Sequence, residues 1–279
     1  MKKTIYPCLW FDGHAKEAAE FYCSLFNNSK ITAENPIVVT FELDGQKFMC
    51  LNGGPQFTMN PSISFFVVCE TEAEIDAIWN KMLEGGSILM ALDKYEWSEK
   101  YGWIQDKFGV NWQLSFGKLT DVGQKYTPTL MFTQNQNGKA EQAINFYTSI
   151  FDNSSIKGIL KFGENDHNTA GTIKHAQFTL DKSVFMAMDG GSAHAFTFNE
   201  ATSLVIDCEN QKEIDYYWDK LTEGGAESMC GWLKDKYGVS WQVVPEILES
   251  LMSDPEKGPR VVQAFMKMKK FDIETLMNA

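Results

Sequence analysis

The chain has 279 residues with a formal net charge of −12, and 44% of its residues are hydrophobic and 22% charged. This length suffices for two domains, and the composition is typical of a globular protein. The negative charge argues against a nucleic-acid partner, and no apolar run reaches the roughly 20 residues that span a membrane. Because no apolar signal segment follows the N-terminus, we expect a cytoplasmic protein without a membrane partner.

The first predicted elements are a strand, a helix and further strands. Residues 5–11 form a strand, and Asp12 with Gly13 opens a helix whose apolar residues recur at the spacing of one buried face. Strands follow at about residues 37–43 and 47–51. The dipeptide Asp44-Gly45 between them supplies the positive φ angles that a tight hairpin requires.

The next stretch repeats this order. Residues 62–69 are predicted to be a strand, and Thr71 with Glu74 forms a capping box for the following helix. Gly85 ends that helix in the left-handed conformation. Further strands close the unit, the last of them at residues 111–116. The order is therefore β-α-β-β-β twice within the first half of the chain.

The second half of the chain repeats the first. Three blocks match in the same order: residues 15–31 with 140–156, residues 41–54 with 178–191, and residues 102–114 with 231–243. Such self-similarity indicates a tandem duplication. We predict one domain at residues 1–121, a second at residues 122–245 and a helical tail at residues 246–279.

Several motifs narrow the interpretation to one family. They are Pro7-x-Leu9-x-Phe11-Asp12-Gly13, Glu84-Gly85-Gly86, Trp97-x-x-x-Tyr101-Gly102 and Asp106-x-Phe108-Gly109-Val110-x-Trp112-Gln113. As a set they resemble the PhnB-like branch of the vicinal-oxygen-chelate superfamily, which also holds glyoxalase I, bleomycin-resistance proteins and dioxygenases. This branch often carries the label 3-demethylubiquinone-9 3-methyltransferase. The resemblance implies an α+β fold of two tandem glyoxalase-like domains, a pseudo-dimer within one chain, and leaves a homodimer open.

The resemblance also implies a divalent metal, held by a His or Glu on the first strand, a His on the fifth and a Glu on the last. The corresponding positions here are Tyr6 and Thr127, Ser62 and Ala201, and Gln113 and Gln242. None provides the imidazole or carboxylate that a tight divalent site requires. The four histidines, His14, His167, His175 and His194, form no evident ligand pair. We therefore expect no metal and no cofactor.

A small-molecule pocket is the main functional expectation. If the modules curl as in the resembling family, strand alternation places Tyr6, Cys8 and Trp10 on the inner side. A loop containing Trp97, Tyr101 and Trp103 forms a wall or lid. With Ser62 and Gln113 these side chains make a neutral aromatic pocket, suited to an uncharged or weakly polar organic ligand. Copy two lacks the stretch that matches about residues 93–100, so we expect the better site in copy one.

Three functions stay open. The first is a metal-independent small-molecule binding protein, and the second is an enzyme, either a glyoxalase-like isomerase or lyase or the methyltransferase of the label. The third is a scaffold without a ligand. No glycine-rich cofactor turn supports methyl transfer, and no catalytic residue stands out. Asp106 and Asp235 occupy equivalent positions before an aromatic-Gly turn, where capping of the turn competes with acid–base chemistry.

Overall fold

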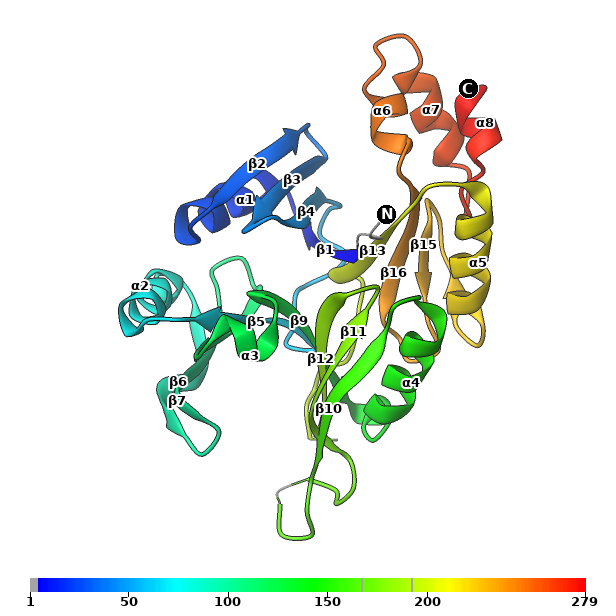
Figure 1. Cartoon of the computed structure of the whole chain (residues 1–279). Coiled ribbons are helices and arrows are strands. Elements are labelled where there is room, and N and C mark those ends of the chain that lie inside the picture. Colours follow the sequence, from blue (N-terminus) through cyan, green and yellow to red (C-terminus); the bar gives the residue numbers. More distant parts are fainter. Residues whose placement is uncertain (1–4, 167, 192) are drawn as a thin grey trace. The chain divides into compact units, whose positions relative to one another are not determined.

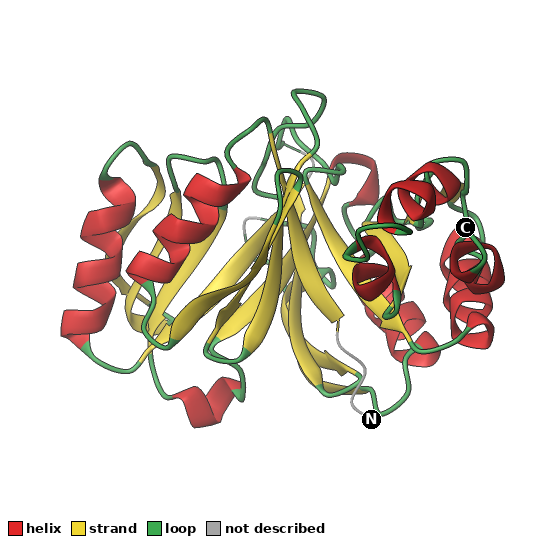
Figure 2. Cartoon of the chain, turned by 90° about the horizontal axis from the view of Figure 1, so that it is seen from above, coloured by secondary structure: helices red, strands yellow, loops and turns green. Residues whose placement is uncertain are grey.

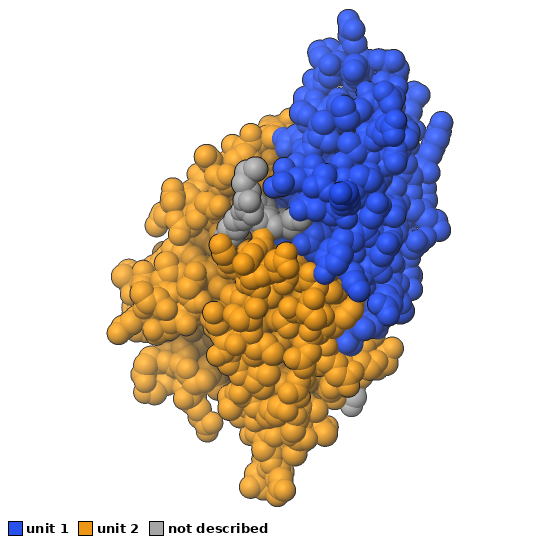
Figure 3. All heavy atoms as spheres, turned by 45° about the vertical axis from the view of Figure 1, so that its right-hand side comes forward, with its two compact units in different colours: residues 1–6, 203–279 blue, residues 7–202 orange. Residues whose placement is uncertain are grey.

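The computed structural model describes residues 5–166, 168–191 and 193–279, so His167, expected in a polar loop, lies outside the described residues. The chain divides into two compact units, coloured separately in Figure 3. Unit 1 is Met1–Tyr6 with Ser203–Ala279, and unit 2 is Pro7–Thr202. Unit 2 thus holds nearly all of copy one and the first half of copy two.

The first copy folds in the predicted order (Figure 1). Its elements are β1 (Ile5–Phe11), α1 (Ala15–Leu25), β2 (Ser29–Glu34), β3 (Val38–Leu43), β4 (Gln46–Asn52), β5 (Ile63–Cys69), α2 (Glu72–Leu83), β6 (Ser87–Tyr95), β7 (Ser98–Gln105), β8 (Asn111–Phe116) and α3 (Leu119–Val122). Parallel pairing joins β1 to β4, and β3 pairs antiparallel with both β4 and β2. The strand-helix-strand half-unit expected from the sequence is confirmed.

The eight-stranded sheet of unit 2 combines strands from both copies. The second copy contributes β9 (Tyr126–Thr133), η1 (Gln134–Gln136), α4 (Ala140–Ile150), β10 (Ser155–Lys161), β11 (Ile173–Leu180) and β12 (Ser183–Gly191). The order is β10-β11-β12-β9-β5-β8-β7-β6. The junction is the antiparallel pair β5 and β9, in which Phe66 lies opposite Thr127 and Ser64 opposite Thr129. This sheet therefore belongs to neither copy alone.

Unit 1 contains the remaining elements. These are β13 (Thr202–Cys208), α5 (Gln211–Thr222), β14 (Ala226–Glu227), β15 (Trp232–Lys234), β16 (Ser240–Pro245), α6 (Leu248–Met252), α7 (Gly258–Phe265) and α8 (Ile273–Met277). The short β14 and β15 stand where copy one has the long β6 and β7, as the missing stretch of sequence predicts. In the described part of the chain no helix is long and apolar enough to cross a bilayer.

Local sequence explains where the elements start and stop. The Thr71 hydroxyl accepts a hydrogen bond of 3.1 Å from the Glu74 amide and so caps α2. Gly85 ends that helix with a φ of 84°. Asp44 and Gly45 have φ angles of 50° and 76°, as the two central residues of the predicted hairpin turn require.

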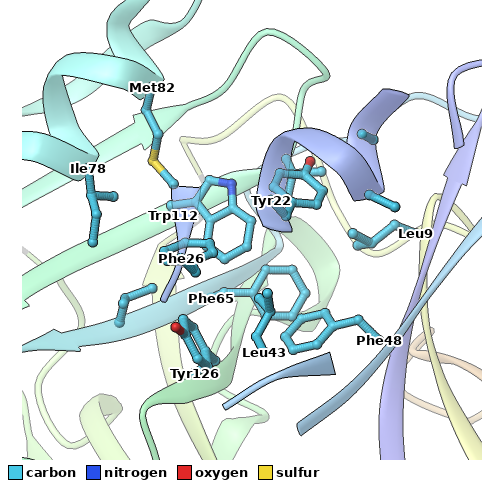
Figure 4. Packing of buried hydrophobic residues seen from close by; sticks show 14 of the residues in the cluster. Leu9, Tyr22, Phe26, Leu43, Phe48, Phe65, Ile78, Met82, Trp112 and Tyr126 are labelled. Atoms are coloured by element: carbon cyan, nitrogen blue, oxygen red, sulfur yellow. The ribbon is translucent and has the colours of Figure 1, made fainter. Parts of the chain in front are cut away.

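Helices α2 and α4 (labelled in Figure 1) pack against one face of this sheet, which we call the mixed sheet because both copies contribute strands, and Figure 2 shows helices along the outer side of the strands. Beneath α2, Trp112 and Phe65 are fully buried and pack with Tyr22 of α1 and Phe48 of β4 (Figure 4). The hydrophobic core of copy one thus lies between its two sheets, on their helix-covered faces. Neither α2 nor α4 covers the opposite face of the mixed sheet, which we call the inner face and which is where we look for a functional site.

Candidate functional site

Strand register defines which side chains share the inner face. One row crosses five strands and consists of Thr127, Phe66, Gln113, Trp103 and Met90. Side chains alternate between the two faces along each strand, so the neighbours of this row point toward the helices. Gln113 therefore points to the inner face and its neighbour Trp112 to the helices.

A chain of neutral hydrogen bonds stands at the centre of the row. The Tyr101 hydroxyl donates to Gln113 Oε1 at 2.7 Å, and Gln113 Nε2 donates to Ser64 Oγ at 2.7 Å. Burial raises the pKa of Tyr101 well above its usual value, so the hydroxyl stays protonated at neutral pH. The chain therefore fixes the Gln113 amide and carries no charge.

Around this chain lies an aromatic and thioether cluster. Tyr101, Trp103 and Met131 are buried, and partly buried apolar side chains pack against them: Phe66, Met90, Tyr95, Met188 and Phe196. The buried members of this cluster come from β7 and β9, which are three strands apart in the sheet order. In a flat sheet that separation is about 14 Å, too far for these side chains to pack together. The sheet must therefore curl, and its inner face is concave.

One polar atom of this cluster has no partner. Trp103 is 8% exposed, and its buried Nε1 forms no hydrogen bond. A buried donor without an acceptor costs about 1–3 kcal/mol, because the group has lost water and gained nothing in exchange. The indole N–H is therefore a place where a bound acceptor recovers free energy.

The segment expected to be a loop or lid is a strand hairpin. Tyr101 and Trp103 lie on β7, which pairs along its length with β6. Trp97 stands at the turn between them and is 61% exposed; its ring stacks on Tyr95 at 5.0 Å between centroids. Register shifts interrupt the pairing of β6 with β7, so polar and apolar residues do not alternate regularly along this hairpin and the sequence does not show it as two strands. Trp97 thus marks the edge of the cluster.

Ser62 is buried just before β5, and its carbonyl accepts a hydrogen bond from the Met131 amide, so alternation with Ser64 places it on the inner face as well. The other predicted site residues lie elsewhere. Cys8 is buried on β1, and Trp10 stands near the end of that strand, where its Nε1 donates to the Gly54 carbonyl at 2.7 Å. Tyr6 belongs to unit 1 and donates to Asp207 Oδ1 at 3.0 Å. Of the eight predicted residues, the mixed sheet brings together Ser62, Trp97, Tyr101, Trp103 and Gln113.

The sequence analysis missed several residues of the inner face. Ser64, Phe66 and Met131 contribute to it because β9 of the second copy lies beside β5 of the first. The sequence shows which residues alternate along each of these strands, but it does not show that strands from different copies pair with each other. On β11 the buried Ala176 points toward the helices, so alternation places the adjacent His175 on the inner face. Burial lowers the pKa of His175.

The divalent metal implied by the resemblance does not fit this site. Thr127 and Gln113 share a row but offer a hydroxyl and an amide, and both amide atoms of Gln113 are already engaged. Ser62 precedes Phe66 of that row by four residues, which is about 13 Å along a strand. Within residues 5–166, 168–191 and 193–279, no group of three or more His, Cys, Asp or Glu side chains could hold a metal ion.

Asp106 and Asp235 cap turns. Asp106 Oδ1 accepts hydrogen bonds from the Phe108 and Val110 amides at 2.8 and 3.0 Å, and Asp235 Oδ1 accepts the equivalent pair in copy two. Asp106 Oδ2 also accepts from Trp112 Nε1 at 2.8 Å. This carboxylate lies on the helix side of the sheet, away from the inner face, so its role is structural.

Comparison with known proteins places this architecture in a family. The family model described as 3-demethylubiquinone-9 3-methyltransferase matches residues 3–115 and again residues 124–244. No curated protein matches the chain.

Two solved structures illustrate the similarity. A PhnB protein from Bacillus cereus is 41% identical, covers 42% of this chain and 100% of its own, and has a TM-score of 0.38. A glyoxalase I mutant from Zea mays is 13% identical, covers 88% of this chain and 94% of its own, and has a TM-score of 0.56. The fold is therefore the α+β fold of glyoxalase I. Because the family model matches twice and spans most of the sequence, the chain belongs to the family described as 3-demethylubiquinone-9 3-methyltransferase, in two tandem copies.

Proposed function

We propose that this protein binds an uncharged, flat organic molecule on the inner face of the mixed sheet, and that no divalent metal takes part. The observation that carries the proposal is the buried Trp103 Nε1, which belongs to an aromatic cluster and lacks an acceptor. A ligand carbonyl or ether oxygen that accepts this hydrogen bond offsets the cost of the unpaired donor.

The chemistry of the surrounding side chains supports a neutral ligand. Gln113, Ser64 and Tyr101 satisfy one another and carry no charge, so they offer no counterion to an anion or a cation. Met90, Met131 and other apolar side chains of the cluster provide dispersion contacts on both sides of a planar ring.

The cluster is densely packed, so a ligand must displace side chains to enter. Methionine suits this role because its unbranched, flexible side chain adapts to different shapes. Met90 is only partly buried and lies opposite Trp103 in the β6–β7 pairing, so rotation of its side chain makes room beside the indole.

A proton-transfer enzyme is a second candidate, because one imidazole shares the inner face. Burial lowers the pKa of His175, so the ring is neutral at pH 7 and able to accept a proton. An isomerase or lyase reaction on this face would use His175 as the base, and His175→Gln would abolish the turnover while leaving ligand affinity intact. Methyl transfer finds no support in the glycines, because Gly53 and Gly86 pack closely against protein atoms and leave no room for a cofactor.

Paired probes test the proposal. Coumarin is flat and carries a carbonyl, whereas naphthalene has a similar size and no acceptor. We expect Trp103→Phe to lower the affinity for coumarin about tenfold, the equivalent of about 1.4 kcal/mol, and to leave the affinity for naphthalene unchanged. Isothermal titration calorimetry measures both. Trp232→Phe, at the equivalent position of copy two, is the matched control.

The stability of the ligand-free variant provides an independent check. Trp103→Phe removes the unpaired donor as well as part of the ring, so we expect little change in the midpoint of urea unfolding. Equal losses for the two probes would show that Trp103 contributes only packing, and the proposed hydrogen bond would be wrong. Binding that requires an added divalent cation would refute the metal-independent part.

A further inference from the structure

A cavity of about 320 Å³ lies apart from the inner face, where β1 ends and α1 begins. We propose that it is a second binding site and that it takes an organic cation, an amine attached to an aromatic or aliphatic body. Its wall comes from three segments of unit 2: the end of β1 with the start of α1, the connection between β4 and β5, and the turn between β7 and β8.

The aromatic wall of the cavity is held in place. Trp10 donates its indole N–H to the Gly54 carbonyl at 2.7 Å, and its ring meets Phe57 edge to face with the centroids 5.0 Å apart. A Cβ atom on Gly53 would stand 2.2 Å from the Trp10 ring, so glycine at this position lets the indole lie against the backbone. Because its N–H is engaged, Trp10 presents carbon and π electrons to the cavity.

One carboxylate at the rim of the cavity has no positive charge to balance it among the described residues. Glu17 lies 3.3 Å from His14 Nδ1 and 3.5 Å from Lys107 Nζ, so its charge is balanced locally. Lys107 Nζ also stands 4.9 Å from the centre of the Phe108 ring. Asp12 lines the cavity, is exposed, and forms no ion pair with a lysine or arginine in the described part of the chain. The rim therefore carries a net negative charge.

A negative rim beside an aromatic wall selects for positive ligands. A cation over an indole or phenyl face is attracted by the ring quadrupole, and a nearby carboxylate adds a direct Coulomb attraction. The volume is at the lower end of the range for small-molecule sites, which fits a single ring with a short amine chain. The net charge of −12 further favours the approach of cations.

This site differs in ligand charge from the inner face, so the two proposals are separable. The probes are phenethylamine, phenethyl alcohol and phenylacetate, which share a ring and differ in charge at pH 7. We expect calorimetric titration of the full chain to show binding in the order amine, alcohol, acetate. Asp12→Asn should lower the affinity for the amine about tenfold, and added salt should weaken it, whereas the alcohol should be unaffected.

Asp152→Asn is the matched control, because it removes one exposed carboxylate at the turn after α4. It should leave all three affinities unchanged. If Asp12→Asn and Asp152→Asn lowered the affinity for the amine equally, the effect would come from net charge alone and the proposed site would be wrong. Unchanged affinity of Asp12→Asn for the amine would also overturn the site. Trp103→Phe tests the inner face separately, because it lies outside this cavity.

Discussion

Replacing Asp106 by alanine should destabilise unit 2 severely, although the residue lies in a turn. Asp106 is 3% exposed, and its Oδ2 accepts hydrogen bonds from the Tyr22 hydroxyl at 2.9 Å and from Trp112 Nε1 at 2.8 Å. Both donors are buried, and water cannot replace the lost acceptor. Alanine leaves both unpaired.

The magnitude follows from those two donors. Each unpaired buried donor costs about 1–3 kcal/mol, so Asp106→Ala should lower the free energy of unfolding by about 2–6 kcal/mol. Of the two turn amides that donate to Asp106 Oδ1, the Phe108 amide is partly exposed and within reach of water, whereas the Val110 amide is buried, so the loss should fall in the upper part of this range. A loss of this size is a large fraction of the stability of an ordinary domain.

Urea denaturation followed by tryptophan fluorescence measures the loss. Asp152→Ala is the control, since it removes an exposed carboxylate from a turn and should change the free energy of unfolding by less than about 0.5 kcal/mol. In a Tyr22→Phe background one donor is already gone, and Asp106→Ala should cost about 1–3 kcal/mol less. A loss below about 1 kcal/mol, or identical losses in both backgrounds, would refute the hydrogen-bond explanation.

Three further predictions concern packing, the inner face and pH. Gly86→Ala should lower the free energy of unfolding by about 1–3 kcal/mol, because a Cβ there would stand 2.2 Å from the Met82 carbonyl oxygen. In the same urea titration Gly117→Ala is the control and should be neutral, because a Cβ at that position meets nothing within 4 Å. Tyr101→Phe leaves buried Gln113 Oε1 without its donor and should cost about 1–3 kcal/mol in thermal or urea unfolding; a loss below 0.5 kcal/mol, on the order expected for a surface change, would contradict the hydrogen-bond chain. Burial raises the folded-state pKa of Asp106 above 3.8, so its protonated form stabilises the fold at low pH and that contribution is lost as pH rises through the folded-state pKa. As pH rises above about 4, the free energy of unfolding of the wild type should therefore fall relative to that of Asp106→Asn. A difference between the two proteins that does not change with pH would contradict the raised pKa.

Local patterns in the sequence predicted individual elements well. The strand at residues 5–11 has the predicted bounds. Asp44 with Gly45 and Thr71 with Glu74 also perform the roles that their chemistry indicates. These features depend on neighbours in the chain, and the sequence contains all that decides them.

Elements without an apolar pattern were harder to locate. The strand β2 (Ser29–Glu34) alternates between partly buried and exposed residues and carries mostly polar side chains, so it has no hydrophobic signal of its own. It forms because β3 beside it offers a free edge, and this pairing is a tertiary effect.

The composition of the candidate site could be predicted only in part. Tyr101, Trp103 and Gln113 were predicted as site residues from the resemblance and the repeat. The sequence did not indicate that β5 would pair with β9, because either copy could complete its own sheet without violating any local pattern. Met131 therefore went unnoticed, and so did the absence of an acceptor for Trp103 Nε1, which depends on side chains from several strands.

The antiparallel pairing of β5 with β9 should hold the two halves of the chain together even after the peptide linker between them is cut. Residues 117–125 include the exposed Thr120 and Asp121, and a protease should cut there readily. The two fragments would nevertheless stay associated, because separation would tear a central strand pair out of an eight-stranded sheet. A nicked molecule should migrate as intact protein until it is unfolded.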